Sequence, residues 1–180
     1  MKKRILILST SLRRGSNSKA LAEEFKNGAM ESGHYVEMIS LEDKRINFCI
    51  GCLACQKTKS CIFNDDVNSI LEKMVTFDAI VFATPIYFYE MSGQMKTLLD
   101  RTNPLYPSEY SFKDIYLIAS AAEDDNSVID GAINGLKGWI ACFEKANLKG
   151  VVRGIGLQES YDFKERKTSL DIAFEMGKNV

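Results

Sequence analysis

The chain has 180 residues, a length that favours one folded domain with its own hydrophobic core. Hydrophobic residues make up 46% and charged residues 26%, which is typical of a globular protein and excludes a disordered chain or a coiled coil. The net charge of −1 leaves no basic surplus for nucleic-acid binding and no acidic tail for a charged partner.

The first apolar run, Ile5 to Leu8, is too short for a signal peptide, and a polar segment follows it at once. No stretch approaches the roughly 20 apolar residues of a membrane-spanning helix. We therefore expect a cytoplasmic protein without membrane contact.

Apolar runs rich in β-branched residues alternate with helical patterns along the chain. The sequence predicts strands at 5–8, 35–41, 78–84, 116–120 and 151–157. It predicts helices at 17–32, 67–76, 93–101, 127–146 and 163–176. Asp65 and Asp66 are candidate caps of the second helix, because carboxylates suit the positive end of a helix. The alternation predicts a three-layer α/β domain with a parallel sheet, in which ligands bind beyond the carboxyl ends of the strands.

The first loop at that edge, residues 9–18, offers five hydroxyl groups, one amide and two guanidiniums before a helix start. Short donors and a helix N-terminus suit a phosphate group. The loop matches neither the Walker motif nor the Gly-x-Gly-x-x-Gly dinucleotide motif. The alternative is a solvated loop in which Ser16 or Asn17 only caps the helix.

The second loop, residues 84–92, places three aromatic side chains directly after a proline, which suits a flat and largely apolar ligand. The alternative is a hydrophobic loop that packs on its own domain or on a subunit partner. The third loop, residues 120–126, begins with small residues that allow close approach of a flat ring. Its acidic continuation fits a solvated loop equally well.

Four of the five cysteines fall within thirteen residues, with the spacing Cys-x2-Cys-x2-Cys-x5-Cys. Thiolates are soft ligands for zinc or for iron–sulfur clusters. Zinc sites usually pair two separated Cys-x2-Cys units, whereas this compact spacing is nearer to cubane ligation. Gly51 can supply the positive φ that such a loop needs. Cys142 sits in a predicted apolar helix and is expected in the core, and His34, the single histidine, is expected in a surface turn.

Two segments resemble the flavodoxin-like NAD(P)H-dependent FMN reductases. These often read Gly-Ser-Pro-Arg-x-x-Gly-Asn-Thr after the first strand, where this chain has Thr10 to Ser18 with four substitutions. They carry Ser/Thr-Pro-x-Tyr-Phe after the third strand, where this chain has Thr84 to Phe88, followed by a helix with Gln94, Lys96, Asp100 and Arg101. The resemblance covers nearly the whole chain. It implies a flavodoxin-like three-layer sandwich with a five-stranded parallel sheet in the order 2-1-3-4-5.

The same resemblance implies FMN as the cofactor and NAD(P)H as the co-substrate. The expected residues around the phosphate are Ser9, Ser11, Arg13, Ser16, Asn17 and Ser18. Those expected along or beside the flavin ring are Pro85, Ile86, Tyr87, Phe88, Ser120, Ala121 and Ala122. Asp100 and Arg101 are expected to form a structural pair.

The cysteine spacing, inserted after the second strand, resembles that of the iron–sulfur flavoproteins. This implies that Cys49, Cys52, Cys55 and Cys61, in a loop at about 47–64 beside the flavin pocket, ligate a [4Fe–4S] cluster. Cluster-free flavodoxin-like reductases also carry cysteine-rich loops here, often followed by Asp-Asp as at Asp65–Asp66. In those proteins the thiols are structural or redox-labile, so both alternatives stay open.

The sequence thus predicts an FMN-dependent oxidoreductase that passes electrons between NAD(P)H or a reduced carrier and an acceptor. Free flavin, a quinone or an electron-transfer protein are the expected acceptors, with a [4Fe–4S] cluster as an added relay where it forms. The flavin carries the chemistry, so no catalytic side chain is expected. The alternative is a flavodoxin-like electron carrier without its own turnover. We expect a single domain over residues 1–180 that forms a homodimer or homotetramer.

Overall fold

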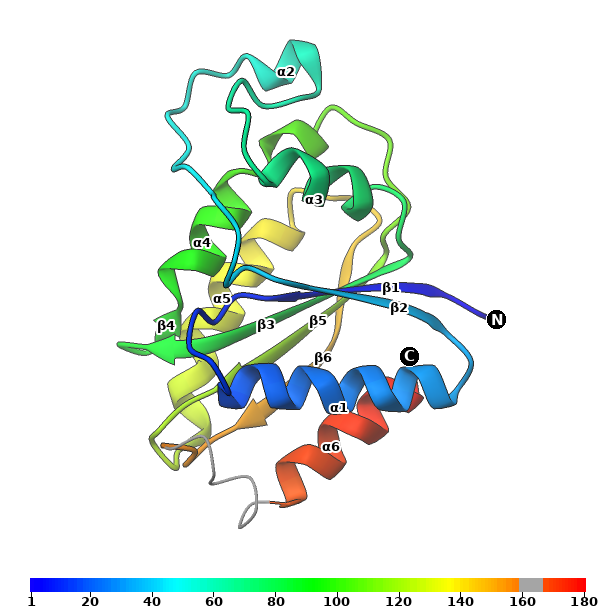
Figure 1. Cartoon of the computed structure of the whole chain (residues 1–180), viewed down its shortest axis with the longest axis vertical. Coiled ribbons are helices and arrows are strands. Elements are labelled where there is room, and N and C mark those ends of the chain that lie inside the picture. The colour runs from blue at the N-terminus through cyan, green and yellow to red at the C-terminus, as the bar shows by residue number, and fades with distance from the viewer. Residues whose placement is uncertain (159–166) are drawn as a thin grey trace.

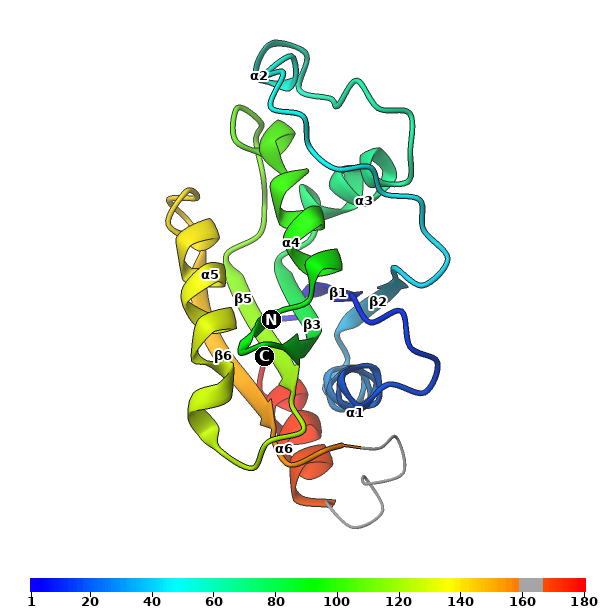
Figure 2. The same ribbon diagram turned by 90° about the vertical axis from the view of Figure 1, so that its left-hand side faces the viewer.

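The computed structural model describes residues 1–158 and 167–180. In these residues one sheet is covered by helices on both faces (Figures 1 and 2). Its parallel strands follow the order β2-β1-β3-β5-β6, and a short β4 pairs antiparallel with β3. The strands are β1 (Arg4–Ser9), β2 (Tyr35–Ser40), β3 (Ala79–Tyr87), β4 (Glu90–Met91), β5 (Asp114–Ser120) and β6 (Asn147–Gly154).

Helices α1 and α6 lie on one face of the sheet, and α3, α4 and α5 lie on the other (Figure 1). The bounds are α1 (Asn17–Glu31), α3 (Val67–Met74), α4 (Gly93–Asp100), α5 (Asp130–Ile140) and α6 (Lys167–Lys178). Three shorter elements are α2 (Cys55–Thr58), η1 (Asn103–Leu105) and η2 (Asn126–Ile129). None of the described helices is long and apolar enough to cross a membrane.

The strand β1 shows why the sheet needs both helical layers. Its side chains alternate between the faces: Ile5 and Ile7 join the core under α1 and α6, while Leu6 and Leu8 join the core on the other face. All four are fully buried. A continuous apolar run is therefore the expected sequence of a strand covered on both sides.

The flavodoxin-like doubly wound fold predicted from the sequence is confirmed. The five parallel strands follow the predicted order 2-1-3-4-5. Their labels differ only because the short β4, which the sequence does not predict, is counted among the strands. Strand β3 extends to Tyr87, so part of the expected loop at 84–92 is strand. Strand β5 begins at Asp114, and β6 covers Asn147–Gly154 rather than 151–157.

Two helix predictions need correction. The expected long helix at 127–146 consists of η2 and α5, and it ends at Ile140, where Cys142 N–H and Phe143 N–H bond three residues back. Cys142 is exposed rather than part of the core. The closing helix, expected at 163–176, ends at Lys178, and its expected first residues, 163–166, lie outside the described residues.

The carboxyl ends of the strands are tied to one another at one edge of the sheet. Thr10 donates both its N–H and its hydroxyl to the carbonyl oxygen of Ala83, at 2.8 and 2.9 Å. Ala121 N–H donates to the carbonyl oxygen of Gly154 at 2.8 Å. The loops that follow β1, β3, β5 and β6 are therefore brought together by the sheet itself.

Candidate functional site

These loops surround a cavity of about 370 Å³ at the carboxyl edge of the sheet. Most of the predicted cofactor-binding residues line this cavity: Ser11, Arg13, Ser16, Asn17, Pro85, Ile86, Tyr87, Phe88, Ser120, Ala121 and Ala122. Ser9 and Ser18 do not line it, since both are fully buried behind it. The predicted residues thus converge on one cavity although they come from three separate segments.

The loop after β1 is shaped by local hydrogen bonds. Ser16 is the N-cap of α1, and its Oγ accepts a hydrogen bond from Lys19 N–H at 3.3 Å. Ser11 Oγ accepts one from Arg13 N–H at 3.2 Å. Gly15 has a φ of 64°, a left-handed conformation that favours glycine. The loop consequently delivers the N-terminus of a 15-residue helix to the cavity.

Three buried polar atoms of this segment have no hydrogen-bond partner among the described residues: Ser9 Oγ, Asn17 Oδ1 and Ser18 Oγ. The other side of the Asn17 amide is held, because its Nδ2 donates to the carbonyl oxygen of Leu157 at 2.9 Å. Buried polar groups are normally paired, since an unpaired one costs free energy. Of these three residues only Asn17 lines the cavity, so its unpaired amide oxygen fits a polar ligand with a hydrogen-bond donor, such as the ribityl chain of FMN.

The aromatic segment forms a hairpin between β3 and β4. Tyr87 pairs with Glu90, and the two residues between them, Phe88 and Tyr89, have φ values of 51° and 63°. Two positive φ values define the tight hairpin turn that usually carries Asn-Gly. Bulky residues there cost about 1–3 kcal/mol each.

This strained turn exposes its aromatic side chains. Tyr87 and Tyr89 are more than half exposed, and Phe88 is fully exposed. Contacts within the described part of the chain therefore do not bury these three rings. The arrangement presents aromatic surface at the mouth of the cavity, where a flat ligand would contact it.

The third side of the cavity is formed by the segment that follows β5. Ser120 and Ala121 are buried, whereas Ala122 and the acidic residues after it are exposed. Leu157 N–H donates to the carbonyl oxygen of Ala121 at 2.8 Å, which brings the segment after β6 to the cavity.

Sequence reasoning missed four lining residues: Tyr89, Glu123, Leu157 and Gln158. Tyr89 and Glu123 directly follow residues that were predicted. Leu157 falls inside the strand predicted at 151–157, whereas β6 ends at Gly154, so that Leu157 and Gln158 follow it at the carboxyl edge.

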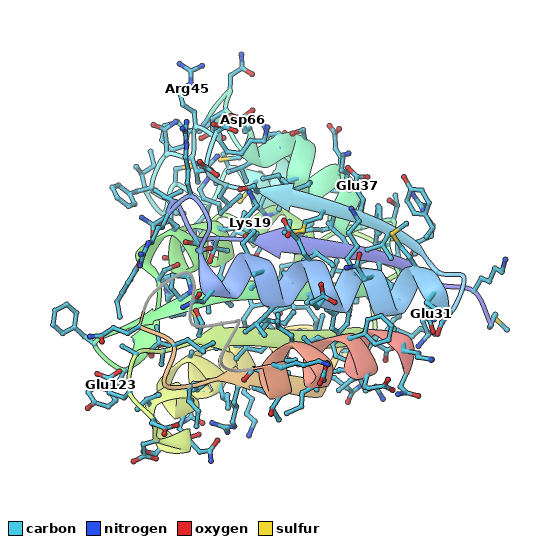
Figure 3. All side chains as sticks on the ribbon, turned by 60° about the horizontal axis from the view of Figure 1, so that its bottom comes forward. Lys19, Glu31, Glu37, Arg45, Asp66 and Glu123 are labelled. Atoms are coloured by element: carbon cyan, nitrogen blue, oxygen red, sulfur yellow. The ribbon has the colours of Figure 1, made fainter. Side chains whose placement is uncertain are left out.

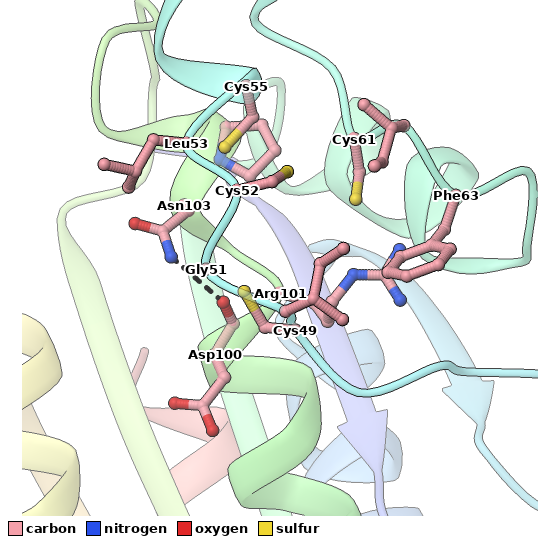
Figure 4. Close-up of a pocket in the computed structure, with 13 residues that line it drawn as sticks. Cys49, Gly51, Cys52, Leu53, Cys55, Cys61, Phe63, Asp100, Arg101 and Asn103 are labelled. Atoms are coloured by element: carbon pink, nitrogen blue, oxygen red, sulfur yellow. Dashed lines mark hydrogen bonds between the residues drawn. The ribbon is translucent and has the colours of Figure 1, made fainter.

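The four clustered cysteines line a second, smaller hollow (Figure 4). All are free thiols, and they lie in the loop that contains α2. Gly51 has a φ of 65°, as predicted, and Leu53 and Lys59 are also left-handed. Burial, and then the neighbouring Cys61, Cys52 and Cys49, raise the pKa of Cys55.

Four soft donors that face one hollow fit an iron–sulfur group in chemistry and number. Among the described residues, however, no three His, Cys, Asp or Glu side chains are close enough together to hold a metal ion. The loop would therefore have to draw its thiols closer when it holds such a group.

The expected pair between Asp100 and Arg101 is wrong. Asp100 accepts a hydrogen bond from Lys96 at 2.6 Å on the exposed face of α4. Arg101 instead forms a buried two-bond pair with Asp65, at 2.8 and 2.9 Å. Side chains one residue apart point in different directions around a helix, so Arg101 faces the core while Asp100 faces solvent.

The two aspartates that were expected to cap α3 form different hydrogen bonds. Asp66 occupies the N-cap position of α3, but its carboxylate accepts a hydrogen bond from Arg45 N–H at 2.7 Å instead of from the helix. Figure 3 shows Asp66 and Arg45 together. Asp65 supplies the side-chain bond to the helix, since its Oδ1 accepts from Val67 N–H at 3.3 Å.

The environment of Asp65 strongly favours its charged form. Burial by itself raises the pKa of this carboxyl, but hydrogen bonds from Arg101 and from the backbone and side chain of Asn47 outweigh burial and hold the pKa well below its ordinary value. Burial lowers the pKa of Arg101, whereas Asp65 and the nearby Cys61 raise it above its ordinary value. The pair is therefore ionised at neutral pH.

The cysteine hollow and the cavity at the sheet edge are two distinct hollows in the described part of the chain. Their described lining residues do not overlap. Helix α4 follows β4 of the aromatic hairpin, and its last residue, Asp100, lines the cysteine hollow. Figure 2 shows α4 running toward the loop that contains α2. The eight residues of α4 correspond to a length of about 12 Å.

The sheet order and the helices on both faces define a flavodoxin-like protein with a cavity at the carboxyl edge of its sheet. The sequence model of the NADPH-dependent FMN reductases matches residues 3–129, and the chain belongs to this family.

The chain is similar to an iron–sulfur flavoprotein of Methanocaldococcus jannaschii, with 41% identity over 57% of this chain and 53% of that protein. It is 30% identical to an iron–sulfur flavoprotein of Archaeoglobus fulgidus over 76% of this chain and 63% of that protein. The matches thus span little more than half the length of these relatives. An NAD(P)H:quinone oxidoreductase from Methanothermobacter marburgensis shares the fold, with a TM-score of 0.80, 19% identity and coverage of 99% and 96% of the two chains.

Proposed function

We propose that the chain is an FMN-dependent oxidoreductase that uses NAD(P)H as its electron donor. The observation that carries this proposal is the cavity at the sheet edge, with its helix N-terminus, unpaired buried polar atoms and exposed aromatic turn. Membership in the NADPH-dependent FMN reductase family supports it. Free flavin, a quinone or an electron-transfer protein would accept the electrons.

In this proposal the loop after β1 binds the phosphate of FMN. Ser11, Ser16 and the N-terminus of α1 donate hydrogen bonds to it, and Arg13 contributes positive charge. Asn17 Oδ1 accepts a hydrogen bond from the ribityl chain, and Ser9 and Ser18 support the loop from behind.

The flavin ring would lie against Pro85, Ile86, Tyr87 and Phe88, with Ser120, Ala121 and Ala122 on its other side. Bound FMN supplies the redox chemistry by accepting a hydride or electrons and passing them on. The protein orients the ring and leaves its reactive edge open to a donor. No side chain of the cavity needs to act as a general acid or base.

Titration of the purified protein with FMN tests the binding site. We expect saturable quenching of flavin fluorescence at one FMN per chain, and a folded protein that does not bind would contradict the proposal. Anaerobic oxidation of NADH and NADPH then tests the reaction. Tight FMN binding without turnover of either nucleotide would favour the alternative, a flavodoxin-like electron carrier.

We further propose that Cys49, Cys52, Cys55 and Cys61 hold a [4Fe–4S] cluster. The hollow that these thiols share supports this, as does the similarity to proteins named iron–sulfur flavoproteins. After anaerobic purification and reconstitution we expect about four irons and four sulfides per chain. Zinc, or no metal, would favour the cluster-free alternative, with structural or redox-labile thiols.

The remaining expectations are also proposals. We propose a single domain over residues 1–180 and a cytoplasmic homodimer or homotetramer that binds no nucleic acid. The exposed aromatic turn and the exposed apolar residues of the cysteine loop support self-association. Light scattering after size-exclusion chromatography measures the subunit number, and a monomer would contradict this proposal.

A further inference from the structure

Arg101 occupies an unusual place for a cation. It is the C-cap residue of α4 and is 1% exposed. It lines the hollow that also contains the four clustered thiols (Figure 4). A buried guanidinium needs acceptors for its five N–H groups, because unpaired charge in an apolar environment is costly.

The outer nitrogens of Arg101 close the cysteine loop at both ends. Nη1 donates to the carbonyl oxygen of Asn47 at 2.6 Å, two residues before the first cysteine. Nη1 and Nη2 also donate to the two carboxylate oxygens of Asp65, four residues after the last cysteine. Asp65 in turn accepts hydrogen bonds from the N–H and the side-chain amide of Asn47, both at 2.9 Å. One arginine therefore fixes the start and the end of the loop.

The remaining nitrogen, Nε, is buried and has no hydrogen-bond partner among the described residues. The ring of Phe63 covers the guanidinium at 5.0 Å. Figure 4 shows the Cys61 sulfur directed toward Arg101. The four cysteines that line the hollow offer sulfur as an acceptor for this N–H.

We propose that Arg101 is a positioning residue for the anionic sulfur group of this hollow: it holds both loop ends, and its Nε–H donates to sulfur of the group that the thiols bind. This inference rests on the proposed cluster at the same thiols. It goes beyond the cysteine ligands, since it assigns a buried cation from α4 to the same site.

A cation and an N–H donor next to sulfur stabilise the more negative, reduced state of an iron–sulfur group and so raise its reduction potential. Arg101→Gln removes the charge and should lower the potential. Asp65→Asn removes the counter-charge but keeps the cation, and should raise the potential. If Arg101 acts only as a structural clamp, Arg101→Gln and Asp65→Asn should both loosen the loop, and the two variants should change the potential in the same direction.

The experiment compares wild type, Arg101→Gln, Asp65→Asn and Arg101→Lys after anaerobic reconstitution. Iron and sulfide content and the reduction potential, followed by visible and EPR spectra, are the measurements. Lys96→Met is the matched control, since it removes an exposed cation from the same helix. FMN titration of every variant shows whether the sheet edge is still folded.

We expect shifts of opposite sign for Arg101→Gln and Asp65→Asn, a smaller shift for Arg101→Lys, and no shift for Lys96→Met. If Arg101→Gln binds FMN but holds no iron while Asp65→Asn holds iron, the inference is also supported. Three outcomes would overturn the role of Arg101 and leave the cluster in place. They are shifts of the same sign in Arg101→Gln and Asp65→Asn, equal loss of iron in these two variants, and a potential that none of the variants changes. A wild-type protein that binds FMN but holds no iron would overturn both the cluster and this role of Arg101.

Discussion

At the residue scale, Asn17 shows how one side chain joins the fold to the proposed cofactor site. Its Nδ2 is bonded to Leu157, which anchors the segment after β6, while its Oδ1 has no partner among the described residues. It is also the first residue of α1, where an anion is favoured by the helix N-terminus. A change of its charge should therefore act on ligand binding more than on the helix.

We predict that Asn17→Asp weakens FMN binding. The substitution places a negative charge next to the proposed phosphate site and removes the donor to Leu157. Repulsion between this carboxylate and the phosphate is the expected cause, and a loss of about 1.5–3 kcal/mol, the size of one charge-assisted contact, would raise the dissociation constant by about 10- to 100-fold. Fluorescence titration measures it, and Asn27→Asp, an exposed change on the same helix, should leave it unaltered. Equal affinities in the two variants would contradict the placement of the phosphate.

The depressed pKa of Asp65 makes its pair with Arg101 a pH-dependent source of stability. The pKa in the folded protein lies below the ordinary value of about 3.9, so the contribution is fully present above that value. It is lost as the pH falls below about 4 toward the depressed pKa, because protonation is then easier in the unfolded chain.

We predict that Arg101→Met lowers the free energy of unfolding by about 3–5 kcal/mol at neutral pH, since it leaves a buried carboxylate unpaired. The difference from wild type should shrink as the pH falls, because the unpaired carboxyl of the variant is protonated first and wild type then loses its ion pair near its depressed pKa. Urea denaturation at a series of pH values measures both. Lys96→Met breaks only an exposed pair and should cost at most about 1 kcal/mol. A pH-independent loss in Arg101→Met would argue against the ion pair as its cause.

At the scale of elements, helix α5 determines where the aromatic hairpin lies. A Cβ atom added at Gly131 would lie 2.3 Å from the carbonyl oxygen of Tyr89, and one at Gly135 would lie 2.8 Å from Met91 Cε. The turn with Phe88 and Tyr89 thus rests directly on the backbone of α5. The absence of side chains at these glycines allows the close approach.

We predict that Gly131→Ala displaces the aromatic turn and weakens FMN binding, because backbone cannot yield as a flexible side chain does. The matched control is Gly138→Ala on the same helix, where the added Cβ meets no atom within 4 Å. That control should leave FMN affinity unchanged and stabilise the helix by up to about 1 kcal/mol. Titration and urea denaturation of both variants test this, and unaltered affinity in Gly131→Ala would refute the link between α5 and the ring site.

At the scale of the whole molecule, α1 and α6 approach each other closely at two glycines. A Cβ at Gly28 would lie 2.0 Å from the carbonyl oxygen of Phe174, and one at Gly177 would lie equally close to that of Phe25. This contact joins the C-terminal helix to the helix that begins at the proposed phosphate site. If residues 1–180 form a single domain, a substitution that disrupts this contact should destabilise the whole chain.

We predict that Gly28→Ala lowers the free energy of unfolding by about 1–3 kcal/mol through overpacking. Circular dichroism and release of bound FMN should report one coincident transition, as expected for one cooperative domain. Two separate transitions, with FMN retained after the first, would contradict the single domain.

The candidate site was largely predictable because the sheet rule and the residue types agree. Loops after parallel strands meet at one edge, and those after β1 and β3 carried recognisable hydroxyl and aromatic residues. The pairing of Arg101 with Asp65 was not predictable, because 36 residues separate them and neighbouring Asp100 was the nearer candidate. The exposure of Cys142 was missed because α5 ends earlier than its apolar pattern suggests.

The sequence by itself determined the doubly wound fold, the segments at the sheet edge and the cluster of four thiols, because these follow from local apolar runs and from spacing. Only the tertiary structure decided that the thiols lie at the far end of α4 from the cavity, with a buried arginine among them. The physical reason is that side-chain direction and long-range packing select partners, and neither is encoded in the distance between residues along the chain.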